Sequence, residues 1–176
     1  MAFDRTALIR KRWTWIDGMR FLLIDKITEL VPHQSVSALK NLSLAEEYLA
    51  DHFPGFPVMP GVLMLETLVQ AGGWLIRHSE DFAQSTILLK EVRAVRYNTF
   101  VSPGNTLLVQ MSVKKRHGAV WDFNGSGTVN GSSAVSARLS LEAFNLSDRN
   151  PELEASDAHR REVYRGIFQQ IWKPPA

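Results

Sequence analysis

The chain has 176 residues, a formal net charge of +2 and no cysteine. This length suits one domain with a substantial core, and 45% hydrophobic residues argue against a disordered chain. So small a net charge does not predict a nucleic-acid-binding protein, and the lack of cysteine excludes disulfides, thiolate metal sites and cysteine nucleophiles. The basic residues near the start precede no long apolar segment or cleavage-site pattern, so we expect a cytoplasmic protein that spans no membrane.

The N-terminal part of the chain predicts two strands and a rigid loop. The expected elements are a basic, partly helical lead-in at residues 1–18, strands at Phe21–Leu30 and Ser35–Leu42, a helical turn at Ser43–Leu49 and a loop at Asp51–Pro60. Pro32 separates the two strands, since proline cannot donate to a strand ladder. Three prolines spaced three residues apart restrict the backbone of the loop.

The stretch Gly61–Ile76 predicts a helix that must be enclosed by the rest of the chain. Its apolar residues lie on every face rather than along one stripe, which is typical of a fully buried helix. Pro60 suits the start of a helix, where its missing N–H costs little. The segment is too short, and too interrupted by Glu66 and Gln70, to cross a bilayer.

The C-terminal part predicts the strands that enclose this helix. Alternating apolar residues and turn signals indicate a strand at Thr86–Tyr97, a turn at Pro103-Gly104-Asn105, and three further strands joined by turns at His117-Gly118 and Asn130-Gly131. An antiparallel sheet curled around one helix, an α+β fold, satisfies this pattern. After Phe144 the composition becomes polar, and Ala158–Trp172 predicts an amphipathic helix that docks on the sheet or on a neighbouring subunit.

Two side chains in this arrangement are candidates for acid–base chemistry. Glu66 lies in the middle of the apolar helix, where an ionised carboxylate needs a partner, and Gln70 is one turn away and could hold it. The alternative is a glutamate at the helix edge paired with an arginine. His52 opens the proline-rich loop, whose rigidity could fix an imidazole in place, although a histidine on a loop is usually without a catalytic role.

Gly61 is a third candidate because it stands at the start of the helix. Unpaired N–H groups and the positive end of the helix dipole point outward there, so a substrate carbonyl could be polarised as in an oxyanion hole. The alternative is a glycine kept for tight packing.

The run His52-Phe53-Pro54-Gly55-Phe56-Pro57-Val58-Met59-Pro60-Gly61-Val62-Leu63, followed by Glu66 and Gln70, resembles the motif of the 3-hydroxyacyl-acyl-carrier-protein dehydratases of fatty-acid synthesis. Phe21–Asp25, Lys40–Ser43 and Val101–Asn105 also resemble segments of that family, so the similarity covers roughly residues 15–144. We therefore expect a dehydratase domain at 1–144 and a C-terminal extension at 145–176.

The resemblance implies a hotdog fold and an obligate homodimer, with a trimer of dimers as a further assembly, in which His52 of one subunit faces Glu66 of the other. It implies that the Gly61 N–H polarises the thioester, His52 removes the α-proton and Glu66 protonates the leaving hydroxyl, without a metal or redox cofactor. The residues expected to contact the substrate are Phe53, Pro60, Gly61, Val62 and Gln70. An acyl carrier protein is acidic, so a basic rim is expected, with Arg93, Arg96 and Lys114-Lys115-Arg116 as candidates or as ordinary solvated residues.

The sequence departs from the family at two places, Asp17–Arg20 and Lys90-Glu91, and both could reshape the acyl tunnel. Two other functions fit the same scaffold. One is a thioesterase or an enoyl-CoA hydratase, and the other is a protein that binds acyl chains or carrier without turnover. The set of His52, Gly61 and Glu66 argues against a pure binder.

Overall fold

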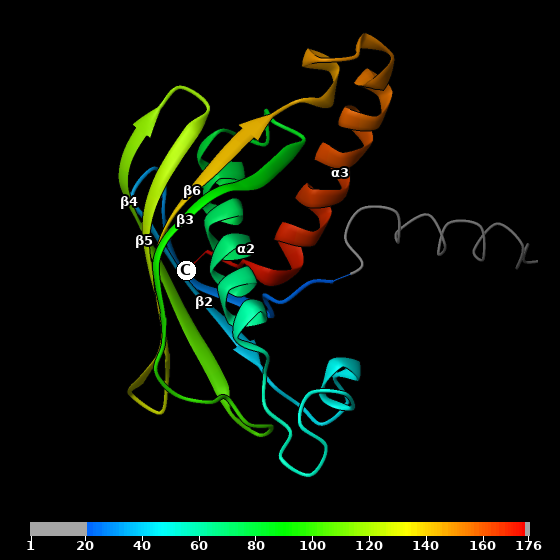
Figure 1. Ribbon diagram of the computed structural model, residues 1–176. Helices are drawn as coiled ribbons and strands as arrows, with labels where there is room; N and C mark the ends of the chain where they lie inside the picture. The colour runs from blue at the N-terminus through cyan, green and yellow to red at the C-terminus, as the bar shows by residue number, and fades with distance from the viewer. Residues whose placement is uncertain (1–20, 175–176) are drawn as a thin grey trace, which may run out of the picture.

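The computed structural model describes residues 21–174, which form one antiparallel sheet, a helix inside its curve and a second helix outside (Figure 1). The strands are β1 Lys26–Val31, β2 Ser35–Asn41, β3 Thr86–Tyr97, β4 Thr106–His117, β5 Val120–Val129 and β6 Ser132–Phe144. The α-helices are α2 Gly61–Ser79 and α3 Glu154–Ile171, and the short 3₁₀ helices are η1 Glu47–Leu49, η2 Leu146–Asp148 and η3 Pro151–Leu153. The expected lead-in at residues 1–18 lies outside the described residues.

The six strands are ordered β1-β2-β4-β5-β6-β3, and all neighbouring pairs are antiparallel. The meander β4-β5-β6 follows from its turns. Gly118, with φ +57°, lies between β4 and β5, and Asn130 and Gly131, with φ +50° and +78°, form the two-residue link between β5 and β6. Two positive φ angles in a row are typical of the type I′ hairpin turn. Strand β3 stands last in this order and pairs with β6 alone among the described strands, so it is an edge strand.

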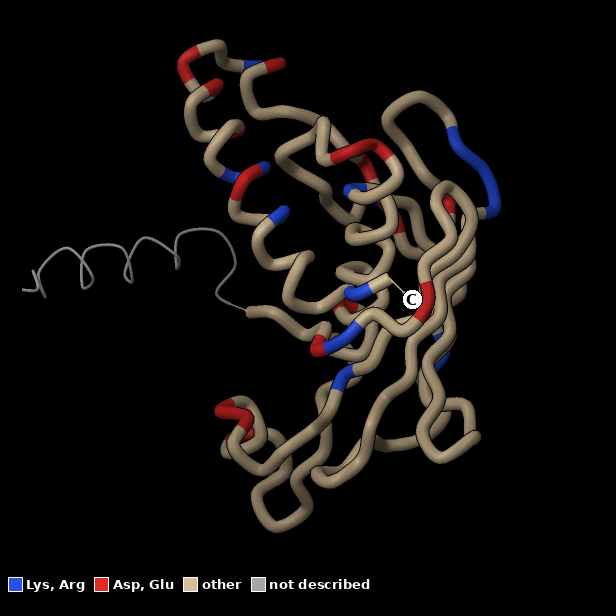
Figure 2. Tube along the Cα trace, turned by 180° about the vertical axis from the view of Figure 1, so that it is seen from behind, with Lys and Arg blue, Asp and Glu red and all other residues tan. Residues whose placement is uncertain are grey.

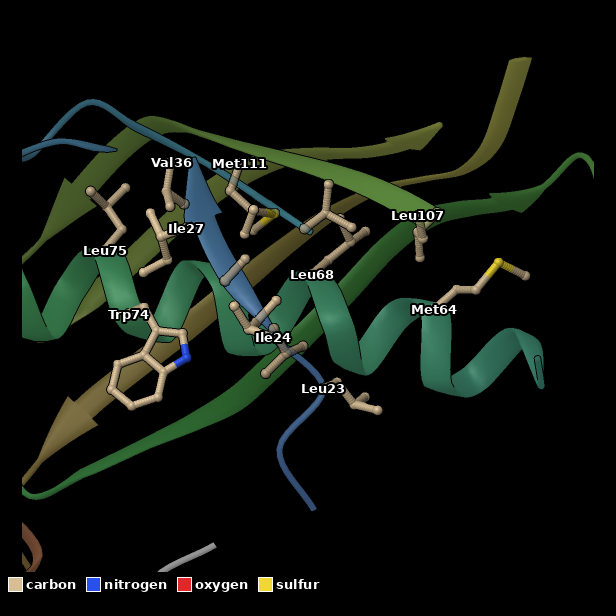
Figure 3. Packing of buried hydrophobic residues seen from close by; sticks show 14 of the residues in the cluster. Leu23, Ile24, Ile27, Val36, Met64, Leu68, Trp74, Leu75, Leu107 and Met111 are labelled. Atoms are coloured by element: carbon tan, nitrogen blue, oxygen red, sulfur yellow. The ribbon is translucent and has the colours of Figure 1, made fainter. Parts of the chain in front are cut away.

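The sheet curves around α2 and buries most of it. Leu68 and Leu75 face the sheet among Ile27, Val36 and Met111, whereas Trp74 points away from these strands (Figure 3). Every residue from Thr67 to Arg77 is buried. The expectation of burial on all sides is wrong only for the first turn and a half of the helix, where Val62 is 69% exposed.

Helix α3 covers the face of α2 that the sheet leaves open (Figure 1). Phe168 contacts Trp74, His78 and Phe82, with ring centroids 6.1, 5.1 and 5.5 Å away. The guanidinium of Arg77 lies 3.9 Å from the ring centroid of Tyr164, and burial lowers the pKa of Arg77 to about 10. The helix therefore docks on α2 of its own chain, where the outward-facing Trp74 provides the apolar surface, and not on the sheet. Docking on a neighbouring subunit, the other expected surface, stays a prediction.

Several boundaries differ from the sequence prediction, and the starts of β1 and α3 are two for which the contacts give a reason. Residues 21–25 precede β1 and lie outside the strand. The start of this segment is tied to α2, since Gln70 accepts a hydrogen bond from Leu23 N at 2.8 Å and donates one to Phe21 O at 2.9 Å, whereas Asp25 N already donates to Leu39 O of β2 at 2.9 Å. Helix α3 begins at Glu154, four residues earlier than expected, because the carboxylate of Asp157 in its first turn accepts hydrogen bonds from Leu146 N and Ser147 N.

None of the helices within residues 21–174 is both long enough and apolar enough to span a membrane.

Candidate active site

The proline-rich loop, the start of α2 and the end of β3 meet at one end of the molecule (Figure 1). They line a hollow of about 350 Å³, within the size range of small-molecule sites. Its lining residues are His52, Phe53, Met59, Gly61, Met64, Tyr97, Asn98, Thr99 and Phe100. The loop is fastened to the segment after β3, because Met59 N donates to Val101 O at 2.8 Å.

His52 is fixed in one orientation by its own loop. Its Nδ1 lies 2.7 Å from the carbonyl oxygen of Val58, a buried residue. Because a carbonyl can only accept a hydrogen bond, Nδ1 carries the proton and the neutral ring has its lone pair on Nε2. Phe53 follows with φ +60°, a left-handed conformation that is strained for a residue with a side chain, and its ring packs against His52 with centroids 4.4 Å apart. The loop therefore holds the imidazole in one orientation, with Nε2 free of this hydrogen bond.

Gly61 is the first residue of α2, and Pro60 is its N-cap. Among the hydrogen bonds of the described residues, Pro60 O accepts from Leu63 N and Met64 N, and none is donated by Gly61 N. The first N–H groups of a helix have no acceptor within the helix, so the Gly61 N–H is available to a carbonyl in the hollow.

Gly61 also has a packing role. A side chain here would put its Cβ 3.2 to 3.3 Å from the ring carbons of Tyr97. Gly61 is absent from the residues with positive φ, so the close ring, and not the backbone conformation, is what opposes a side chain. Both interpretations of this glycine, the exposed N–H and the tight packing, therefore agree with the structure.

Glu66 belongs to a different part of the helix surface. It is five residues after Gly61, which corresponds to about 140° around the helix and about 7.5 Å along it, and it is not among the residues that line the hollow. Gln70 Nε2 donates to Glu66 Oε1 at 3.0 Å, as the one-turn spacing predicted. No ion pair of Glu66 is found among residues 21–174, so a glutamate satisfied by an arginine is not what this part of the chain shows.

Of the other residues expected to contact the substrate, some line the hollow and some do not. Phe53 lines the hollow with His52 and Gly61, while Val62, Pro60 and Gln70 do not. Lys90 and Glu91 do not line it either, because they lie on the exposed edge strand, where Lys90 pairs with Glu142 at 2.9 Å and Glu91 pairs with Arg93. The departure at Asp17–Arg20 lies outside the described residues.

Tyr97 and the segment after it were not identified from the sequence. The alternation of side chains along β3 does not predict that Tyr97 reaches the hollow. The pairing with β6 shifts register between Arg93 and Arg96, and this shift determines the side to which Tyr97 points. Partial burial raises the pKa of Tyr97 above its ordinary value. Among residues 21–174 no group of three or more histidine or acidic side chains is arranged to hold a metal ion.

The sequence matches the FabA-like domain over residues 16–138. The chain belongs to this family. It is 42% identical over 113 residues to the 3-hydroxyacyl-(acyl-carrier-protein) dehydratase FabZ of Myxococcus xanthus, covering 63% of this chain and 74% of that one. It is 37% identical over 130 residues to the enzyme of the same name from Nitratidesulfovibrio vulgaris, covering 73% and 84%.

Solved structures agree on the fold. A chain of the dehydratase heterocomplex ApeI:P from Xenorhabdus doucetiae aligns with a TM-score of 0.62 at 21% identity, covering 76% of this chain and 90% of that one. A Streptococcus mutans protein solved with acetyl CoA aligns with a TM-score of 0.55 at 13% identity, covering 73% and 94%. Together with the sheet wrapped around α2, these likenesses confirm the hotdog fold.

Proposed function

We propose that this protein dehydrates 3-hydroxyacyl thioesters of acyl carrier protein to trans-2-enoyl thioesters, with His52 as the base and Glu66 as the acid. Membership of the FabA-like family and the names of the FabZ relatives support the reaction. The observation that supports the site best is the hydrogen bond from His52 Nδ1 to Val58 O, which leaves Nε2 free to accept a proton. His52 and Gly61 line the same hollow. In this mechanism the Gly61 N–H polarises the thioester carbonyl and thereby acidifies the α-carbon.

The proposal requires two copies of the chain. Glu66 is outside the hollow of its own subunit, so the acid must come from a second copy. Edge strand β3 supports such a homodimer, because within residues 21–174 its twelve residues have a neighbouring strand on one side alone and expose Leu88, Leu89 and Val95. A long apolar edge strand is prone to pair with another chain, and a two-fold axis would join two β3 strands in antiparallel fashion. A trimer of dimers is part of the same proposal.

The basic residues on the outside of β3 are the better candidates for carrier docking. Arg96 is exposed and adjacent to Tyr97 of the hollow, and Arg93 faces Arg138 across β3 and β6. The run Lys114-Lys115-Arg116 lies at the β4–β5 hairpin, at the opposite end of the molecule from the proline-rich loop (Figure 2). Arg116 pairs with Glu80 at 2.6 and 2.9 Å, as Arg93 pairs with Glu91, so ion pairing does not distinguish the two groups. Because the end of β3 lies beside the hollow, we propose that the carrier docks at Arg93 and Arg96.

The activity is tested with 3-hydroxyacyl and crotonyl thioesters of carrier protein, by following enoyl absorbance for wild type, His52→Ala and Glu66→Gln. Loss of activity in both variants supports the assignment, and equal rates in all three proteins overturn it. Release of free thiol in place of enoyl product would indicate a thioesterase. Arg96→Glu should raise KM for the carrier thioester and leave the CoA thioester unaffected, whereas the control Lys115→Glu should change neither.

The domain limits, a dehydratase domain at 1–144 and an extension at 145–176, belong to this proposal, as does a cytoplasmic location, which fractionation of the source cells would test. The contacts of Phe168 support an extension packed on the domain rather than an independent unit.

A further inference from the structure

A β-bulge in strand β3 determines where Tyr97 points. Val92 pairs with Leu139 of β6 and Tyr97 pairs with Val135, so five steps along β3 match only four along β6. Leu139 and Val135 are both buried on the concave face of the sheet. Because side chains alternate along a strand, a regular β3 that placed Val92 on this face would place Tyr97 on the opposite one. The extra residue reverses that direction.

The bulge requires a strained backbone. Ala94, within the irregular stretch, has φ +52°, a conformation that favours glycine. A bulge commonly re-aims a side chain near a functional site, and here the side chain concerned is a tyrosine that lines the hollow together with His52.

The ring that the bulge turns toward the hollow packs on Gly61, with Tyr97 still 45% exposed. Its carbons Cδ1, Cε1 and Cζ lie 3.2 to 3.3 Å from where a Cβ of Gly61 would stand. One side of the first residue of α2 is thus covered by a flat ring, while the hollow beside it contains His52. A thioester carbonyl can reach the Gly61 N–H only along the directions that this ring leaves free.

We propose that Tyr97, turned inward by the bulge at Ala94 and Val95, is a positioning residue: its ring covers one side of Gly61 and directs the thioester carbonyl to the Gly61 N–H from the side of His52. This inference rests on the proposed dehydratase function. The ring, and not the hydroxyl, carries the role, because the three atoms of Tyr97 nearest to where a Gly61 Cβ would stand are ring carbons. The thioester is common to all acyl substrates, so the effect is independent of acyl length.

The test compares Tyr97→Phe and Tyr97→Ala with wild type on 3-hydroxyacyl thioesters of four and ten carbons. Since a misplacement of about 1 Å can cost on the order of a hundredfold in rate, we expect Tyr97→Ala to lower kcat about tenfold or more, with KM changed less than about threefold and the same loss at both lengths. Tyr97→Phe should keep the wild-type kcat. A kcat for Tyr97→Ala within about twofold of wild type, a loss confined to one chain length, or an equal loss in Tyr97→Phe overturns the inference.

A second measurement uses the contact itself. Gly61→Ala keeps the N–H but moves the ring of Tyr97, so it should lower kcat much less when Tyr97 is already alanine. Additive effects of the two substitutions on kcat contradict the inference. If Tyr97→Ala shows no cooperative thermal transition, Tyr97→Leu replaces it under the same criteria. A wild-type protein that turns over none of the thioesters refutes the proposed function, whereas an active wild type with unaffected Tyr97 variants refutes only the positioning role.

Discussion

Two inactive variants should restore each other's activity when mixed, because His52 and Glu66 of one chain do not share a hollow. Glu66 points about 140° around α2 from Gly61 and is hydrogen-bonded to Gln70, outside the hollow that contains His52. When equal amounts of His52→Ala and Glu66→Gln chains exchange freely, half of the dimers are mixed, and each mixed dimer has one intact site of two. The expected recovery is about one quarter of the wild-type activity, from the statistics of a two-fold dimer.

The assay follows enoyl absorbance after subunit exchange, with differently tagged chains so that mixed dimers can be isolated and counted. The double variant His52→Ala/Glu66→Gln mixed with wild type is the matched control. Sites shared between chains predict that its mixed dimers are inactive, while sites within one chain predict half activity. Exchange that is demonstrated by the tags but restores less than a few per cent of activity would refute the cross-subunit site.

Three further predictions concern stability. Asp157→Ala should lower the free energy of unfolding by about 3 kcal/mol, because Ser85 Oγ, Leu146 N and Ser147 N lose a charged acceptor. Burial opposes the ionisation of Asp157, but these hydrogen bonds outweigh it and lower its pKa to about 2, so its stabilisation is present above about pH 4 and is lost as the pH falls from there towards 2. Ala94→Gly should raise stability by about 1 kcal/mol, since glycine tolerates φ +52°. Phe168→Ala should cost about 3 to 5 kcal/mol by removing the ring that packs on α2.

Urea unfolding followed by tryptophan fluorescence measures each change. Glu162→Gln, at an exposed position of α3, is the control for Asp157→Ala and should be neutral. Ala143→Gly, opposite Ile87 in a regular part of the β3–β6 pairing, should destabilise where Ala94→Gly stabilises. An Asp157→Ala protein that matches wild type at pH 7, or one that keeps the wild-type loss of stability between pH 4 and 2, would contradict the account of the buried carboxylate.

The local elements follow closely from the sequence. Thr86–Tyr97 was predicted with the bounds that β3 has, and the positive φ angles of Asn130 and Gly131 confirm the expected hairpin. These features depend on neighbouring residues, whose period and turn preferences act over a few positions. The buried helix was predicted for the same reason, because apolar residues on every face require an enclosure. The motif from His52 to Gln70 indicated the candidate residues for the acid–base site. The hydrogen bond between Glu66 and Gln70 agrees with their one-turn spacing.

The tertiary structure decided the relations between segments that are distant in the chain. The Val58 carbonyl binds Nδ1 of His52 and leaves Nε2 as the nitrogen that the proposed mechanism uses, and the pairing of β3 with β6 shows the extra residue that turns Tyr97 onto Gly61. A periodic pattern cannot reveal such a bulge, because one inserted residue exchanges the two faces of a strand without changing its composition. The docking of α3 on Trp74 depended on which face of α2 the sheet left open. The residue types of the candidate site could therefore be proposed from the sequence, whereas their directions and neighbours required the packed chain.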